Sequence, residues 1–276
     1  MFLPQELSYY IISLGCPKNE VDAERLNADL HNAGFVPAHG MDDANIIFIN
    51  TCGFIKEAKE ESIATIMDAI DYTAHAATKK LIVFGCLTQR YKDEIIHEIP
   101  EIDLVWGLYD SSMINEVARI CTVDLLTVTI AQKRKPLVDN IPYAYIKIAE
   151  GCSNNCSYCA IPIIRGKHRS YAPELIVDDA AQALQRGVKE LIVVAQDVAI
   201  YNYNGVLVND LLHKLNNLDG TFWIRLMYCH PDHISSELIE AMATLQKVVH
   251  YIDIPFQHAS TKILRAMNRK GNAKRY

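Results

Sequence analysis

The run YIKIAEGCSNNCSYC, residues 145–159, joins an apolar strand directly to three cysteines. Cys152, Cys156 and Cys159 have C-x3-C-x2-C spacing, and three thiols this close together cannot all pair with one another as disulfides. They can hold three corners of a cubane iron–sulfur cluster, whose irons take cysteine thiolate ligands. Because the run has no fourth cysteine, the fourth iron is open to bind another molecule. We therefore expect these three residues to form a catalytic metal centre rather than a passive electron carrier.

The strand that leads into this run is the first of a repeating strand–helix pattern. The pattern predicts strands at residues 145–149, 191–195, 222–226 and 248–254, and helices at 173–186, 209–217, 235–245 and from 260 onward. Four consecutive strand–helix units are typical of a (β/α) barrel, although four do not close one. We therefore expect a partial barrel over residues 143–276, with an unpaired edge at its fourth strand. We also expect the sequence to stop short of its natural end.

The first half of the chain alternates in the same way. It predicts strands at residues 9–14, 45–50, 80–84 and 103–107, and helices at 21–33, 58–74 and 91–99. Continuous apolar strands between helices indicate a parallel sheet that is covered on both faces. The predicted fold is α/β, with a doubly wound parallel-sheet domain over residues 1–124 and a linker over 125–142. The basic run 133–135 is interpreted as an exposed part of this linker.

A second set of cysteines emerges when the sequence is aligned with these strands. Cys16, Cys52 and Cys86 each come just after the carboxyl end of a predicted strand. Ligands of open parallel sheets bind outside those strand ends, so three neighbouring strands can bring three thiolates together. Core packing and zinc binding are the alternatives, since buried cysteines pack as small hydrophobes and catalytic zinc also takes three protein ligands. The compact run elsewhere in the chain favours iron–sulfur chemistry here too.

Composition excludes several classes of protein. The chain has 276 residues, a net charge of -6 and 50% apolar residues, so no broad basic surface indicates direct DNA binding. It shows neither a secretory signal nor an apolar run of about 18 residues that would span a membrane. We expect a cytoplasmic protein, in which thiols stay reduced and eight cysteines indicate metal binding. Cys121 and Cys229 are interpreted as core residues.

The compact run, with Tyr158 before its last cysteine, resembles the signature of the radical S-adenosylmethionine (SAM) superfamily. Nearly the whole chain is similar to the methylthiotransferases of that superfamily, which join such a barrel to an N-terminal domain with three more cysteines. The stretch LGCPKNEVDAE, residues 14–24, resembles the branch that modifies a ribosomal protein, whereas the tRNA branch typically has Gln-Met-Asn after the cysteine. Residues 50–62 and 160–166 agree with the ribosomal-protein branch.

The resemblance implies two 4Fe-4S clusters, one in each domain, and SAM bound at the open iron of the barrel cluster. It implies that reductive cleavage of SAM yields a radical, which removes hydrogen from the β-carbon of an aspartate. A methylthio group is then installed there, on small-subunit ribosomal protein twelve, free or on the ribosome. The implied electron donor is a protein such as flavodoxin or ferredoxin. The family also carries the rest of the barrel and a C-terminal TRAM domain, which these residues do not include.

Four further residues are predicted to bind the cofactor. Tyr158 is placed against the adenine of SAM, and Arg225 against its carboxylate. Gln196 and Gln257 follow the second and fourth barrel strands, at the end of a barrel where active sites lie. The chain departs from the family pattern on the barrel loops, where Tyr171 replaces the usual Arg. Such departures bear on substrate contacts rather than on the clusters.

Two other functions remain open from the sequence. The first is a tRNA adenosine methylthiotransferase, which the Pro17-Lys18 pair and the acidic balance disfavour. The second belongs to another class, a zinc-binding interaction module without catalysis. Iron and sulfide in anaerobically purified protein distinguish the enzyme from the zinc module.

Overall fold

The structure, a computed structural model, describes residues 7–74, 78–123, 133–272 and 274–276. The chain divides into two compact units, Met1–Leu137 and Val138–Tyr276. Residues 125–132 of the predicted linker 125–142 lie outside the described residues. No helix of the described residues is long and apolar enough to cross a membrane.

The N-terminal unit contains a five-stranded sheet in which every neighbouring pair of strands is parallel. The order is β2-β1-β3-β4-β5, from β1 (Ser8–Ser13), β2 (Val36–Pro37), β3 (Ile46–Thr51), β4 (Lys80–Gly85) and β5 (Leu104–Val105). This is the strand order of flavodoxin-like folds, whose ligands bind at the point between β1 and β3 where the winding reverses.

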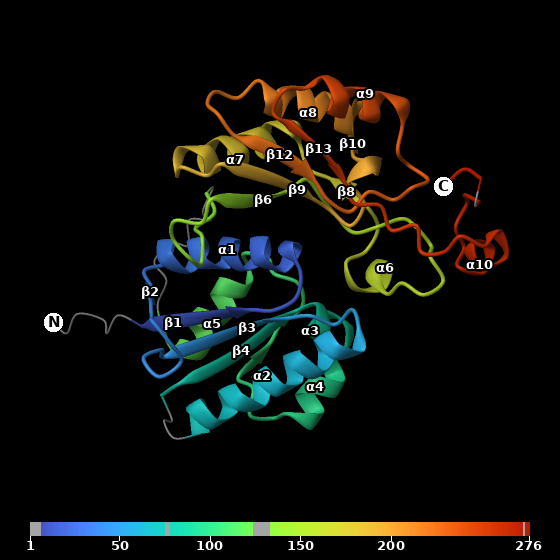
Figure 1. Cartoon of the computed structure of the whole chain (residues 1–276). Coiled ribbons are helices and arrows are strands. Elements are labelled where there is room, and N and C mark those ends of the chain that lie inside the picture. The colour runs from blue at the N-terminus through green and yellow to red at the C-terminus, as the bar shows by residue number, and fades with distance from the viewer. Residues whose placement is uncertain (1–6, 75–77, 124–132, 273) are drawn as a thin grey trace. The chain divides into compact units, whose positions relative to one another are not determined.

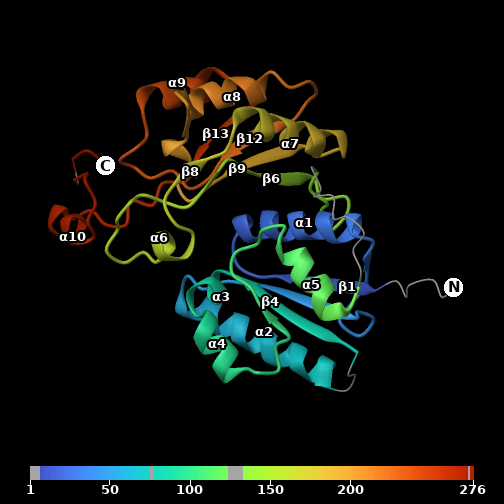
Figure 2. The ribbon, with the colours of Figure 1, turned by 180° about the vertical axis from the view of Figure 1, so that it is seen from behind.

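Helices cover both faces of this sheet, as the apolar strands predict. They are α1 (Pro17–Asn32), α2 (Lys56–Ala74), α3 (Cys86–Arg90), α4 (Lys92–Glu98) and α5 (Met113–Cys121). Along β3, Ile46 and Phe48 pack with α1 and α5, whereas Ile47 and Ile49 pack with α2, α3 and α4. Figure 1 shows α1 and α2 on opposite faces, and Figure 2 shows α5 from behind. The doubly wound fold is therefore confirmed.

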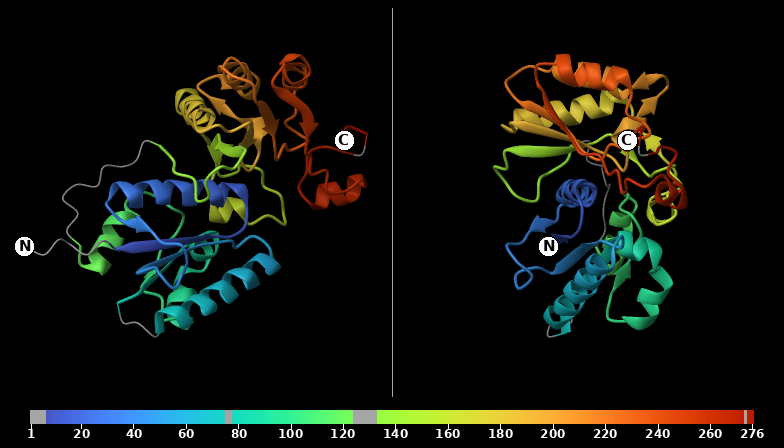
Figure 3. Two further views of the ribbon diagram at one scale, coloured as in Figure 1. Left: turned by 60° about the vertical axis from the view of Figure 1, so that its left-hand side comes forward. Right: turned by 45° about the vertical axis from the view of Figure 1, so that its right-hand side comes forward.

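The C-terminal unit contains four parallel strands in the order β13-β12-β9-β6. These are β6 (Tyr143–Lys147), β9 (Glu190–Val194), β12 (Trp223–Leu226) and β13 (Val248–Ile252). Helices α7 (Pro173–Gln185), α8 (Val208–Asn216) and α9 (Ser236–Thr244) lie on one face, as the yellow to orange helices of Figure 3 show. The four strand–helix units and the edge position of β13 agree with the predicted partial barrel.

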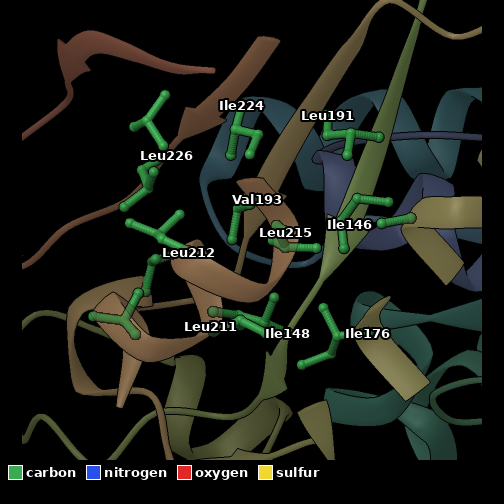
Figure 4. Close-up of a cluster of buried hydrophobic side chains, with 14 of the residues drawn as sticks. Ile146, Ile148, Ile176, Leu191, Val193, Leu211, Leu212, Leu215, Ile224 and Leu226 are labelled. Carbon is green, nitrogen blue, oxygen red and sulfur yellow. The ribbon is translucent and has the colours of Figure 1, made fainter. Parts of the chain in front are cut away.

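One face of these strands forms the core with the helices. Ile146, Val193 and Ile224 point to the same side as Leu211 and Leu215 of α8, and Figure 4 shows this packing. Cys229 is fully buried in this core, and Cys121 packs at the edge of the N-terminal core, so the packing roles expected for both cysteines are confirmed. The residues between the core positions of each strand face the other side, which is the inner side of the partial barrel.

Several short elements are not predicted by the sequence. They are β7 (Ala149–Glu150), β8 (Arg169–Ser170), α6 (Ile161–Ile164), η1 (Val198–Ile200), β10 (Asn202–Tyr203) and β11 (Val206–Leu207). For α10 (Thr261–Ala266), the sequence predicts the start of the helix but not its end. Elements this short carry no hydrophobic period that a sequence could reveal. The antiparallel β7–β8 pair matters most, because it brackets the cysteine run.

The expectation of an exposed basic run at residues 133–135 is wrong for its central residue. Arg134 is only 8% exposed and forms an ion pair with Glu24 of α1. Asn27 of the same helix donates its side-chain amide to the carbonyls of Lys135 and Pro136, at 3.1 and 2.9 Å. This segment therefore packs against α1, because both its charge and its backbone find partners there.

Candidate functional site

The first candidate site lies at the carboxyl edge of the N-terminal sheet. Cys16 is the residue before α1, Cys52 directly follows β3, and Cys86 is the first residue of α3 after β4. Because β1, β3 and β4 are neighbours in register, the three cysteines emerge from adjacent strand ends. Cys52 and Cys86 are buried, and Cys16 is half-buried.

Two glycines let the cysteine segments approach one another closely. A Cβ on Gly15, whose φ is +89°, would lie only 2.9 Å from the Cys52 sulfur. A Cβ on Gly53 would lie 2.9 Å from the carbonyl oxygen of Cys86. Side chains at these positions would clash with Cys52 and with the backbone of Cys86. The structure therefore brings the three segments close together, which fits a metal cluster held by three thiolates.

Asn19, in the first turn of α1, connects all three segments. Its side chain is fully buried and donates to the carbonyls of Leu14 and Thr51, at 2.9 and 3.0 Å. Its amide oxygen accepts a hydrogen bond from the Cys86 thiol at 3.5 Å. One side chain thus ties the strand ends before Cys16 and Cys52 to Cys86. Sequence reasoning gives Asn19 no role, because nothing local distinguishes it from an ordinary helix-start residue.

The second candidate site is the loop from residue 151 to 168 of the C-terminal unit. Gly151 has a φ of +73°, and a Cβ there would lie 2.6 Å from the carbonyl oxygen of Gly166. The backbone N–H of Cys152 donates to that same oxygen at 3.0 Å. The backbone N–H of Cys159 donates to the carbonyl of Cys156 at 3.1 Å. The loop is thus folded back on itself, with its first cysteine buried and the other two half-buried.

Backbone N–H groups point at two of these sulfur atoms. The N–H of Asn154 donates to the Cys152 sulfur at 3.4 Å. Burial raises the pKa values of the Cys152 and Cys159 thiols, while hydrogen bonds from the N–H groups of Asn154 and Ile161 act in the opposite direction. N–H donors at buried sulfurs suit thiolates that ligate a metal, since they stabilise the charged form.

A buried charge network lies at the start of the cysteine run. Glu150 forms ion pairs with Lys147 and Arg165 and accepts from the Gln196 amide at 3.1 Å. Burial alone would raise the pKa of Glu150, but the two cations outweigh burial and lower it to about 2. The carboxylate is therefore charged at neutral pH and anchors the strand end from which the run departs.

The four residues predicted to bind the cofactor lie in different places. Gln196 lies beside the cysteine run through Glu150, and the exposed Tyr158 accepts from Arg269 at 2.7 Å. Arg225 instead pairs with Glu190, the first residue of β9. Gln257 is exposed, with a φ of 68°. The structure therefore connects Gln196 to the start of the run through Glu150, and it gives Arg225 an ion pair with Glu190.

Comparison with known proteins first defines the class. Residues 146–276 match the model of the radical SAM superfamily, and residues 8–107 match an uncharacterised protein family, UPF0004. The fold agrees with a solved radical SAM methyltransferase, TsrM from Kitasatospora setae. That structure has a TM-score of 0.63 and 11% identity over 98% of this chain and 64% of its own. The sequence of the C-terminal unit from residue 146 onward therefore matches the radical SAM superfamily.

Relatives with curated names then indicate a particular kind of radical SAM protein. A protein of Acetivibrio thermocellus named ribosomal protein uS12 methylthiotransferase RimO is 44% identical over 95% of this chain and 62% of its own length. Proteins of the same name from Petrotoga mobilis and Thermodesulfovibrio yellowstonii are 42% and 43% identical, over 95% and 98% of this chain. The chain spans about three fifths of these relatives, between 61% and 63% of their length. The predicted resemblance to radical SAM methylthiotransferases is confirmed.

Proposed function

We propose that this chain acts as a radical SAM methylthiotransferase that adds a methylthio group to the β-carbon of an aspartate in ribosomal protein uS12. The observation that carries the proposal is the presence of two three-cysteine sites, each at the carboxyl ends of parallel strands. A radical alone needs one such site, so the second indicates a separate sulfur-bearing centre. The names of the relatives and the LGCPKNEVDAE stretch support uS12 as the substrate.

Each unit has its own part in this proposal. Bound to this chain, two 4Fe-4S clusters and SAM supply the radical and the transferred sulfur and methyl groups. Cys152, Cys156 and Cys159 hold one cluster, and the Glu150 network anchors the strand end beside it. The second cluster is held by Cys16, Cys52 and Cys86, which are the ligands of the N-terminal unit. Tyr158 and Gln196 are the predicted cofactor contacts that lie nearest the first group.

Two further parts of the proposal concern the cell. Reductive cleavage of SAM needs an electron from outside the protein. A small redox protein such as flavodoxin or ferredoxin is suited to donate it. Since uS12 is a ribosomal protein, the proposed substrate also implies a cytoplasmic location.

Iron content tests the two sites separately. The chain is reconstituted anaerobically with iron and sulfide, as are the Cys16/Cys52/Cys86 and Cys152/Cys156/Cys159 triple alanine variants. Each triple variant is expected to lose about half of the bound iron, because each removes all protein ligands of one cluster. Cys121→Ala is the control and should retain the full amount. Full retention in the first triple variant would remove the N-terminal site from the proposal.

Substrate choice is tested with the reconstituted protein, SAM, a reductant and either uS12 or unmodified tRNA. Mass spectrometry should find a methylthio group on an aspartate of uS12 and none on tRNA. A methylthio group on tRNA alone would instead establish the tRNA reaction. Cleavage of SAM with no modification of either would show that this chain does not recognise uS12 by itself.

A further inference from the structure

Asp197 lies three residues after β9, just before η1, and is only 1% exposed. One carboxylate oxygen accepts the backbone N–H groups of Ala199 and His230, both at 3.2 Å. The other accepts the side-chain amide of Asn154 at 2.8 Å and lies 2.6 Å from Nδ1 of His233. Four donors from three segments of the chain therefore converge on one buried carboxylate.

Four is also the number of hydrogen bonds that a carboxylate accepts through its lone pairs. A buried ionised carboxylate is costly unless such partners surround it, so the arrangement is stable only when all of them are in place. Asp197 therefore holds the cysteine run, the end of β9 and the loop after β12 at fixed positions relative to one another.

Asn154 is the member of this group that reaches the cysteines. It lies between Cys152 and Cys156 in the sequence, and its side chain is the one that binds Asp197. Its backbone N–H is the group that donates to the Cys152 sulfur at 3.4 Å. The same residue thus connects the carboxylate to the sulfur, through its side chain on one side and its backbone on the other.

We propose that Asp197 is a positioning residue for the cysteine run: by holding the Asn154 side chain, it fixes the Asn154 N–H on the Cys152 sulfur and so tunes the metal centre of the run. The cluster part of this inference rests on the proposed function, whereas the placement of the thiol does not. Hydrogen bonds to cluster sulfurs are among the factors that set reduction potential. Removing the hydrogen bond from the Asn154 N–H should make the reduction potential of the cluster more negative, because this N–H stabilises the reduced form.

A divalent cation is the competing interpretation of the same group. Asp197, His230 and His233 offer ligand atoms within 4.8 Å of one another, and the two imidazole rings lie 5.0 Å apart between centroids. However, the oxygen nearest His233 already accepts from Asn154, and the other oxygen accepts two backbone N–H groups. A cation would have to displace donors that the fold supplies, so the hydrogen-bonded arrangement is favoured.

The first test uses the cluster-free protein. Asp197→Asn places an amide donor against the Asn154 amide, and Asn154→Ala removes the link. Because the Asn154 N–H stabilises the thiolate, its loss from the sulfur should lower the alkylation rate of Cys152 about two- to tenfold in both variants, the factor expected from the loss of one hydrogen bond. The swapped double variant, Asn154→Asp with Asp197→Asn, restores a donor–acceptor pair and should return the rate towards that of the parent protein. Asn155→Ala is the matched control, because Asn155 uses its carbonyl in the contact with Asn268.

The second test uses the reconstituted protein. The EPR spectrum of the reduced cluster should change and its reduction potential should become more negative in Asn154→Ala, while the iron content stays unchanged. Unchanged alkylation in both single variants, or the absence of rescue by the swap, would overturn the positioning role. The protein could also bind one equivalent of Zn²⁺ that is lost in Asp197→Asn but retained when the cysteines are replaced. That result would overturn the positioning role in favour of a cation site. Failure of the run to bind any cluster would count against the proposed function alone, since the alkylation result stands independently.

Discussion

At the scale of single residues, one buried polar side chain organises each three-cysteine site. Asn19 joins the ends of two strands to Cys86, and Asp197 joins the cysteine run to the loops after β9 and β12. Both side chains use their polar atoms fully, as buried polar groups must. These two side chains therefore connect the segments that carry the thiols to other parts of the same unit.

Glu150 shows the same principle with charges, and it makes a pH dependence predictable. Its pKa of about 2 in the folded protein lies below its ordinary value of 4.5. A lowered pKa means that the charged form contributes stability above about pH 4.5, and that this contribution is lost as the pH falls towards 2. The effect should therefore appear on the acid side of the unfolding profile.

Replacing Glu150 by Gln should lower the free energy of unfolding at pH 7 by roughly 3–5 kcal/mol, because Lys147 and Arg165 would remain buried without their carboxylate. The difference from the parent protein should shrink between about pH 4.5 and 2. Urea unfolding followed by circular dichroism across this range measures both. Glu240→Gln, at an exposed position of α9, is the control and should change little. A constant difference at every pH would contradict the assignment.

At the scale of elements, the turn from β4 into α3 determines where Cys86 lies. Gly85 has a φ of +108°, and a Cβ there would lie 2.5 Å from the Asn50 side-chain oxygen and 2.6 Å from the Thr51 carbonyl. Only glycine combines this backbone conformation with such close packing. The helix can therefore start at Cys86 itself, directly beside the end of β3.

Gly85→Ala should be more destabilising than Gly34→Ala, although both residues have a positive φ. Gly34 has a φ of +90°, and a Cβ added there would have no atom within 4 Å, so its substitution costs only backbone strain of about 1–2 kcal/mol. Gly85→Ala adds the clash with β3, and we expect a clearly larger fall in the midpoint of thermal unfolding. Equal shifts for the two variants would show that the turn relaxes freely.

At the scale of the whole molecule, the described residues form separate hydrophobic cores within each compact unit. The N-terminal cores include Phe48 and Ile47, and the C-terminal core includes Ile146 and Ile224. Since each compact unit buries its own apolar residues, local stability in one unit should not depend on packing in the other.

Phe48→Ala should therefore increase amide hydrogen exchange in the strands of the N-terminal unit and leave β6, β9 and β12 unchanged. Removal of a buried Phe side chain typically costs about 3–5 kcal/mol, which is enough to raise exchange throughout one core. Ile224→Ala is the reciprocal variant and should affect only the C-terminal strands. Exchange followed by mass spectrometry measures both, and faster exchange in both units from either variant would show that they unfold together.

The sequence alone established the strand–helix alternation, both sets of cysteines and the resemblance to radical SAM methylthiotransferases. The features behind these predictions are local, because a hydrophobic period or a C-x3-C-x2-C spacing involves only residues that are close together in the sequence. The positions of the long strands followed from their apolar runs. The short β7–β8 pair did not, since two residues carry no period.

Only the tertiary structure decided which residues surround the thiols. Asn19 with Cys86, Asn154 with Asp197, and Glu150 with Arg165 are pairs that lie 15 to 67 residues apart. Such pairs form because strand order and loop closure bring their backbones together, and residue type gives no sign of it. Local sequence specified the candidate metal ligands, whereas long-range packing determined the hydrogen bonds and charges around them.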